Sequence, residues 1–263
     1  MFKRFGRLLW AGVFALCVSL GAYSSAWAGD LSDRLASFPD WRSPPKGAVA
    51  QGELIYPDWF EGSWQATTTL KDAVAPLSPD IVTPGFEQNK ASLGQPVEFT
   101  VRFSDEVMDR PVQGLRGITG LGIEPQATGI VADRVFNTKS LADAAVHPGY
   151  VKSVDLDPDD FSRLITQFEG GQQLVSESRE RAIEQESPQD FISSEMFIQT
   201  FRTVDEIYLN RVENTTGYNQ VNPDRIEADQ ITAIYLSPKD PDFFRARNRP
   251  VALYRYDLIL ERS

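Results

Sequence analysis

The nine residues "YPDWFEGSW", Tyr56–Trp64, combine four aromatic side chains with a Gly-x-Trp motif and follow a proline-rich segment. Such a stretch fits a cofactor-binding segment, an exposed patch or the start of a barrel. The next residues, Gln65–Leu70, are rich in threonine, which favours a strand, and Gly62 allows a sharp bend before them. We therefore expect the first strand to begin near Gly62, with the aromatic cluster at its entry.

Regular alternation of apolar and polar residues marks two further strands. Val97–Phe103 has four apolar residues on one face, and Val251–Leu260 has apolar residues at its even-numbered positions, with Arg255 and Asp257 on the other face. Residues 71–96 contain four prolines and predict a long loop that serves as a lid or a binding loop.

Other strand-like runs follow at short intervals. They are residues 129–137, 150–156, 163–169, 172–180, 191–201, 205–213 and 230–236. Gly170-Gly171 fits a hairpin turn, residues 140–146 fit a short helix, and residues 176–186 fit either a helix or a strand. About ten short strands with little helix predict an all-β fold, an antiparallel up-and-down β-barrel of about eight to ten strands with one or two short helices.

The N-terminus reads as an export signal. Three basic residues among the first seven precede an apolar run, Leu8–Ala22, and Ala26–Ala28 fits a cleavage site. We expect residues 1–28 to be a cleaved signal peptide, residues 29–53 a tether, and residues 54–263 one β-barrel domain. The alternative is an uncleaved N-terminal anchor. The apolar run is shorter than the ~20 residues that a membrane-spanning helix needs.

The composition of the chain limits the partners and the metal ligands that can be expected. Cleavage after Ala28 would remove three basic residues and no acidic one, which changes the net charge from −11 to −14, so nucleic acid is not an expected partner. The single cysteine, Cys17, lies in the predicted signal, so the mature chain has no disulfide and no thiol ligand. A strongly acidic surface also disfavours docking on anionic lipid headgroups, unless the protein has a local basic patch.

No residue stands out as catalytic. His147 is the only histidine and has no serine motif beside it, so a triad is not expected. Asp155–Asp160 is the best candidate for calcium, but it lacks the glycine and the distal glutamate of a calcium loop, which favours a solvated acidic turn. We expect no metal, no cofactor and no enzyme activity, while a cofactor-free enzyme using carboxylates and tyrosines stays open.

The Gly-x-Trp motif before a long loop and a series of antiparallel strands resembles the lipocalin and wider calycin pattern. In those families the tryptophan closes one barrel end beneath a basic residue from near the C-terminus. The resemblance implies this role for Gly62 and Trp64, with Arg255 as the basic partner and Arg262 as the second choice. The alternative is a core tryptophan in some other β-fold.

Three stretches extend the resemblance: residues 55–64, residues 81–89 and residues 250–262 are similar to an uncharacterised family of exported proteins of cyanobacteria and plastid lumens. This resemblance implies a thylakoid lumen or periplasm and an association with photosynthetic membranes. It implies no activity.

The leading functional expectation is that a small apolar ligand, a lipid or a pigment, binds in a barrel cavity. The expected lining residues are Phe99, Val101, Phe197, Tyr254 and Tyr256. Glu195 and Arg211 alternate with apolar residues, so they point either into the cavity or toward solvent. The alternative is a non-catalytic accessory or assembly protein that docks on a photosynthetic membrane complex through the tether and the loop 71–96.

Overall fold

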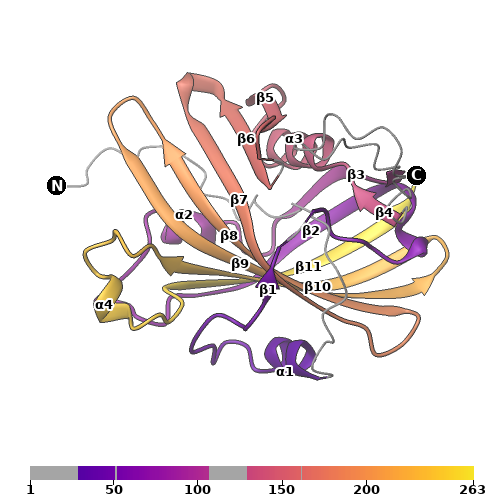
Figure 1. Cartoon of the computed structure of the whole chain (residues 1–263), viewed down its shortest axis with the longest axis horizontal. Coiled ribbons are helices and arrows are strands. Elements are labelled where there is room, and N and C mark those ends of the chain that lie inside the picture. The colour runs from indigo at the N-terminus through magenta and orange to yellow at the C-terminus, as the bar shows by residue number, and fades with distance from the viewer. Residues whose placement is uncertain (1–28, 51, 107–128, 161) are drawn as a thin grey trace, which may run out of the picture.

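The computed structural model describes residues 29–50, 52–106, 129–160 and 162–263, which form a mostly β structure (Figure 1). Ten strands pair in the order β4-β3-β2-β11-β10-β9-β8-β7-β6-β5, and β1 pairs with β7. Every pairing is antiparallel. The sheet curls strongly into a half-barrel, which confirms the predicted antiparallel β fold.

The strands are β1 (Ala48–Val49), β2 (Gly62–Val74), β3 (Pro96–Glu106), β4 (Gly129–Ala132), β5 (Val151–Leu156), β6 (Arg163–Phe168), β7 (Gln173–Glu184), β8 (Asp190–Arg202), β9 (Ile207–Asn222), β10 (Arg225–Leu236) and β11 (Ala252–Arg262). The α-helices are α1 (Asp30–Ala36), α2 (Phe86–Lys90), α3 (Arg134–Ala145) and α4 (Phe243–Ala246). The described residues thus hold four short α-helices, more than the one or two expected from the sequence.

The strand order follows the chain almost throughout. From β5 to β11 each strand pairs with the next, and β11 then pairs with β2, so that Leu260 lies opposite Ala66. Strands β4 and β5 are the two ends of the path, although they are consecutive in the chain. The up-and-down order is therefore interrupted at one seam, which the connection between these two strands spans.

Helix α3 occupies this seam and contacts both β3 and β5. The Asn137 side chain accepts a hydrogen bond from the Arg102 N–H (2.8 Å) and donates one to the Arg102 carbonyl (3.0 Å). At the other end of α3, the Asp143 carboxylate accepts one from the Val151 N–H (2.9 Å). Burial raises the pKa of Asp143, but hydrogen bonds from Lys139 and Val151 outweigh it and lower that pKa below its usual value. The helix thus satisfies backbone groups of β3 and β5, which lie on the two sides of the seam.

The structure corrects one local prediction and decides between the alternatives at another place. The predicted strand 129–137 ends at Ala132, because the Asp133 side chain accepts a hydrogen bond from the Phe136 N–H (2.9 Å) and caps α3. The sequence of residues 176–186 fits either a helix or a strand, and most of these residues belong to β7, where pairing with β8 outweighs helix propensity. The hairpin at Gly170-Gly171 joins β6 to β7 as predicted, with φ near +78° and +77°.

The loop predicted for residues 71–96 is shorter and better packed than expected. Strand β2 continues to Val74, past a bulge opposite Arg255 and Tyr256, and β3 begins at Pro96. The connection between them contains α2, whose Phe86 is buried 5.8 Å from the Tyr254 ring. The loop therefore covers part of the sheet instead of extending away from it.

The expectation of a tether at residues 29–53 is also wrong, because this segment packs on the sheet. The Glu184 carboxylate accepts hydrogen bonds from the Leu31 and Ser32 N–H groups at the start of α1 (2.9 and 3.3 Å). Arg34 pairs with the fully buried Glu213 of β9 (2.5 Å), and Trp41 is 4% exposed. The segment covers part of the convex face and pairs with β7 through β1, and Leu54 and Tyr56 beyond it are buried in the cluster on the concave side.

Candidate ligand site on the concave face

The stretch Tyr56–Trp64 enters the interior of the half-barrel. Trp64 is completely buried, and its indole N–H donates a hydrogen bond to the Phe60 carbonyl (2.8 Å). The Tyr56 ring lies 4.6 Å from Phe60 and 4.9 Å from Phe103, between ring centroids. These contacts make the stretch an internal aromatic cluster at one end of the sheet and not an exposed patch.

A basic residue covers the tryptophan, as the Gly-x-Trp resemblance implies, but it is Arg262. Its guanidinium lies 4.3 Å from the centroid of the Trp64 ring and donates a hydrogen bond to the Glu61 carbonyl (2.9 Å). Gly62 has φ +117°, and a Cβ atom there would lie 3.0 Å from the Arg262 guanidinium. Glycine thus permits both the backbone bend and the close approach of the arginine.

The expectation that Arg255 fills this role is wrong. Arg255 lies on the opposite face of β11, where its guanidinium makes two hydrogen bonds to the Asp229 carboxylate (2.9 and 2.7 Å). Side chains alternate along a strand, and Arg255 is out of phase with the buried Tyr254 and Tyr256, whereas Arg262 is in phase. The same alternation that defined the final strand therefore decides between the two arginines.

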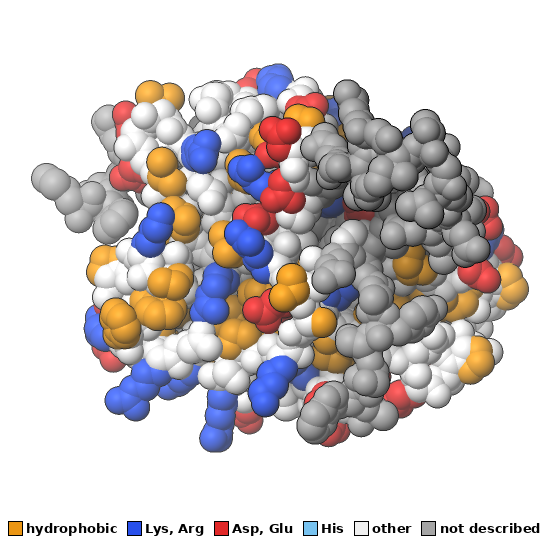
Figure 2. All heavy atoms as spheres, viewed as in Figure 1, with side chains coloured by type: hydrophobic (Ala, Val, Ile, Leu, Met, Phe, Trp, Pro, Cys, Tyr) orange, Lys and Arg blue, Asp and Glu red, His pale blue; other side chains and the backbone are white. Residues whose placement is uncertain are grey.

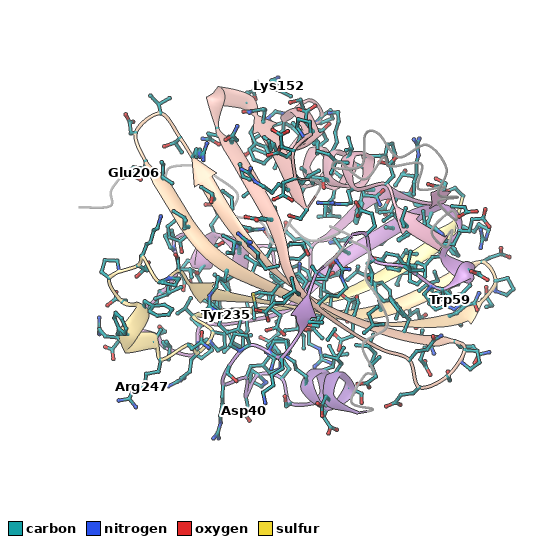
Figure 3. The ribbon with its side chains drawn as sticks, viewed as in Figure 1. Asp40, Trp59, Lys152, Glu206, Tyr235 and Arg247 are labelled. Carbon is teal, nitrogen blue, oxygen red and sulfur yellow. The ribbon has the colours of Figure 1, made fainter. Side chains whose placement is uncertain are left out.

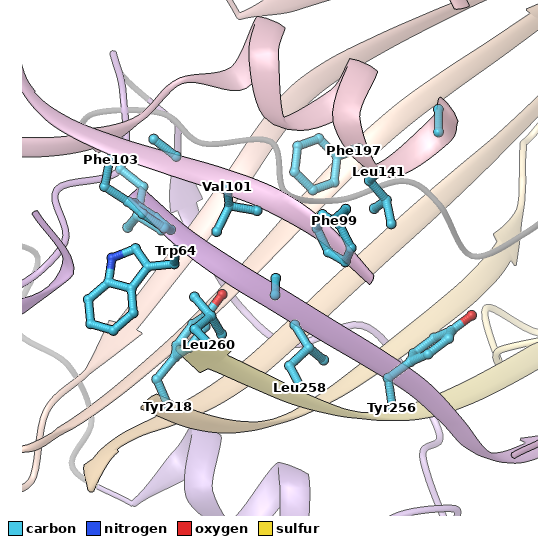
Figure 4. Packing of buried hydrophobic residues seen from close by; sticks show 14 of the residues in the cluster. Trp64, Phe99, Val101, Phe103, Leu141, Phe197, Tyr218, Tyr256, Leu258 and Leu260 are labelled. Atoms are coloured by element: carbon cyan, nitrogen blue, oxygen red, sulfur yellow. The ribbon is translucent and has the colours of Figure 1, made fainter. Parts of the chain in front are cut away.

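The five residues expected to line a cavity come together in the main hydrophobic cluster. Their exposed fractions are Phe99 5%, Val101 0%, Phe197 1%, Tyr254 2% and Tyr256 9%. Figure 4 shows Phe99 of β3 and Leu141 of α3 on the side of β2 that faces Phe197 of β8. The concave face of the sheet and the helix at the seam thus surround one apolar interior.

Charged side chains also lie within this interior. Arg181 of β7 and Glu195 of β8 are opposite in the sheet register and are each 6% exposed. The Arg181 Nε and Nη2 atoms lie 3.0 and 2.9 Å from Glu195 Oε1. Of the two readings for Glu195, the inward one is correct. Arg211 instead lies on the convex face, over the rings of Tyr235 and Phe243.

Neutral polar side chains continue the row across β9 and β10. Thr216 donates to Gln230 (3.4 Å), Gln230 donates to Thr232 (3.3 Å), and Thr232 donates to Asn214 (2.7 Å), which lies opposite Glu195 in the register. We call Arg181, Glu195, Asn214, Thr216, Gln230 and Thr232 the polar row. In the sequence, only Glu195 indicates the polar row, because it alternates with apolar residues. The single hydroxyl and amide side chains of β9 and β10 have the pattern of ordinary exposed residues.

Two tyrosines connect the polar row to the aromatic cluster. The Tyr56 and Tyr218 rings meet edge to face with 6.3 Å between their centroids, and Tyr218 lies two residues after Thr216 on the same face of β9. Burial raises the pKa of Tyr218 to about 12, and burial together with Tyr218 and the Glu195 charge raises the pKa of Tyr56 well above its usual value. Both phenols are therefore neutral at physiological pH and able to donate hydrogen bonds.

A second pair of amides lies further along the same face. Gln199 of β8 and Asn210 of β9 are opposite in the register and are 3% and 4% exposed. The Gln199 Nε2 and Asn210 Oδ1 atoms are buried and have no hydrogen-bond partner among the described residues. A buried donor and a buried acceptor next to each other are suited to a polar group supplied from outside the protein.

The other sequence candidates lie outside this interior. His147 is exposed, with its Nε2 atom 3.3 Å from the Glu169 carboxylate. In the acidic turn 155–160, Asp157 pairs with Arg163 (2.7 Å). Within the described ranges, no three histidine, cysteine, aspartate or glutamate side chains gather closely enough to hold a metal ion.

Comparisons with known proteins place the chain in a family. No curated protein and no solved structure matches it significantly. Of the helices that the structure describes, none has the length and apolar character needed to cross a membrane. A family model for a domain of unknown function, DUF6816, matches residues 48–263, from β1 to the C-terminal residue. The chain therefore belongs to the DUF6816 family.

Proposed function

We propose that this protein is an exported, lipocalin-like binding protein that holds one small, mainly apolar molecule, a lipid or a pigment, against its concave face. The observation that carries the proposal is the polar row inside an otherwise apolar, aromatic interior. Burying an ion pair and several amides costs free energy that an apolar core avoids. Ligand sites commonly combine such a few polar groups with a mostly hydrophobic lining.

The arrangement suggests how a ligand is held. Phe99, Phe197 and Tyr256 supply apolar contact for a hydrocarbon body. Arg181 supplies a charged donor, while the amides of Gln199 and Asn210 offer a donor and an acceptor to a polar group. A molecule with a long apolar body and one polar end fits this distribution better than a uniformly polar one. Binding, and not catalysis, is the proposed role.

The covering elements support the same proposal. The loop between β2 and β3 places Phe86 beside Tyr254, and the Asn89 side-chain amide donates a hydrogen bond to the Tyr254 hydroxyl (3.2 Å). A loop fixed in this way is better suited to cover a bound molecule than to reach a distant complex. The stack of Arg262 on Trp64 is the feature that the calycin resemblance implies for the closed end. The signal-like N-terminus supports a lumenal or periplasmic location.

Two neighbouring threonines of β2 provide a matched test. Thr68 lies opposite Leu258 on the concave face, Thr67 lies opposite Ile259 on the convex face, and both are half-buried. We expect Thr68→Phe to weaken binding of all-trans-retinol or an anthroyloxy-labelled stearic acid at least about tenfold, because the added ring occupies the proposed site, a change of about 1.4 kcal/mol. Fluorescence titration measures the affinity.

Thr67→Phe is the control, since it adds the same ring to the same strand on the other face. It is expected to bind the probes as the unsubstituted protein does. Equal weakening by both substitutions would contradict a concave site. Failure of the unsubstituted protein to bind either probe would contradict the proposed function itself. Circular dichroism should establish that both variants keep the β fold.

A further inference from the structure

The connection between β10 and β11 exposes an aromatic side chain among arginines. Phe244 in α4 is 83% exposed, and Arg245, Arg247 and Arg249 are exposed around it. Single exposed apolar residues are common on protein surfaces and need no special explanation. Phe244 differs because the turn that carries it is firmly fixed.

The neighbours of Phe244 hold the turn in place. Phe243 packs against a small hydrophobic cluster formed by Ile81, Leu236, Ala246 and Val251. The Ala246 N–H donates a hydrogen bond to the Asp242 carbonyl (2.9 Å), and the Arg211 guanidinium donates one to the Asn248 side chain. Adjacent phenylalanines therefore point to different surroundings, one toward the protein and one toward solvent. A turn already ordered in this way loses little conformational entropy when it docks.

The turn is basic although the chain is acidic. Residues 239–249 contain four basic and two acidic residues, whereas the whole chain has a net charge of −11. Asp242 pairs with Arg245 (2.5 Å), while Arg247 and Arg249 form no ion pair with any other residue that the structure describes. Lys and Arg side chains gather at the lower left of Figure 2, where Figure 3 labels Arg247. The turn is therefore a local basic patch on an acidic protein, and such a patch can bind an anionic surface that the rest of the protein would repel.

We propose that residues 242–249, the arginine–phenylalanine turn, dock the protein on the surface of an anionic lipid bilayer. Guanidinium groups pair with lipid phosphates, and an exposed phenyl ring enters the boundary between headgroups and acyl chains. Such a surface places negative charge directly above an apolar layer, which matches arginines surrounding a phenylalanine. An acidic protein surface would pair with the arginines but would provide no apolar layer for the Phe244 ring. This proposal does not depend on the interior ligand site.

Vesicle flotation tests the proposal on the full chain, purified as its host processes it so that all variants share one N-terminus. The vesicles contain phosphatidylcholine alone, or equal parts of phosphatidylcholine and phosphatidylglycerol. We expect binding only to the anionic vesicles, and release at high salt. Replacing Arg247 and Arg249 together by glutamate should weaken binding about thirtyfold or more, and Phe244→Ala should weaken it about fivefold.

A double variant, Lys71→Glu with Lys152→Glu, is the control because it changes the net charge equally at exposed sites outside the turn. Figure 3 labels Lys152 at the edge of the molecule opposite Arg247. Equal weakening by the control would overturn the proposal, because total charge would then explain binding. Absence of binding to the anionic vesicles would also overturn the proposal, and co-purification of a membrane protein that depends on Arg247 would then favour an acidic protein partner.

Discussion

Replacing Glu195 by alanine is expected to lower the free energy of unfolding by about 3–5 kcal/mol, because it removes a carboxylate that pairs with the buried Arg181 guanidinium. The two residues are each 6% exposed, and their side chains make two contacts of 3.0 Å or less. Urea denaturation followed by circular dichroism measures the change. A loss below about 1 kcal/mol would contradict a desolvated ion pair, since exposed pairs contribute that little.

A double variant separates the structural role of this pair from its proposed role in binding. Arg181→Met combined with Glu195→Leu removes both charges and keeps apolar volume, so its stability is expected to equal or exceed that of the unsubstituted protein. The same variant should bind a fatty acid more weakly, because the charged donor for its polar end is gone. Unchanged affinity would place the polar row outside the ligand site.

Trp64→Ala is expected to cost about 3–5 kcal/mol of stability, as truncation of a fully buried aromatic residue does. The substitution removes the ring from the cluster with Phe60, removes the hydrogen bond to the Phe60 carbonyl and leaves Arg262 without its aromatic partner. Denaturation in urea again gives the change. A cost below about 2 kcal/mol would show that the cluster is loosely packed.

A double-mutant cycle identifies the arginine that covers Trp64. Arg262→Ala and Trp64→Ala should be coupled by about 0.5–1 kcal/mol, the usual size of a partly exposed cation–π contact. Arg255→Ala should show no coupling to Trp64→Ala, because Arg255 pairs with Asp229 on the other face. Coupling to Arg255 in place of Arg262 would contradict the observed stack.

Much of the sheet was predictable from the sequence, because alternation along a strand is a local property. The pattern of β11 separated Tyr254, Tyr256 and Leu258 from Arg255, and the structure buries the same three side chains. The glycine pair at residues 170–171 marked its hairpin through the backbone freedom of glycine. The same alternation predicts which arginine stacks on Trp64, because of Arg255 and Arg262 only Arg262 is in phase with the buried residues of β11.

Features that depend on contacts between distant residues were not predictable. Residues 29–53 have the composition of a linker. In the structure, however, Arg34 pairs with the carboxylate of Glu213, which is more than one hundred residues away in the sequence, and Trp41 is buried. The polar row combines four strands, and single hydroxyls or amides carry no periodic signal that separates buried from exposed positions. Helix α3 follows a capping aspartate inside a stretch that also reads as a strand. In each case tertiary contacts decide the outcome.

Native mass spectrometry of the protein purified gently from its own host tests the central claim most directly. The proposed function predicts a one-to-one adduct of a lipid or pigment above the mass of the bare chain, and it predicts that Thr68→Phe reduces this adduct while Thr67→Phe retains it. A bare mass for the unsubstituted protein under conditions that preserve non-covalent complexes would contradict a resident ligand on the concave face.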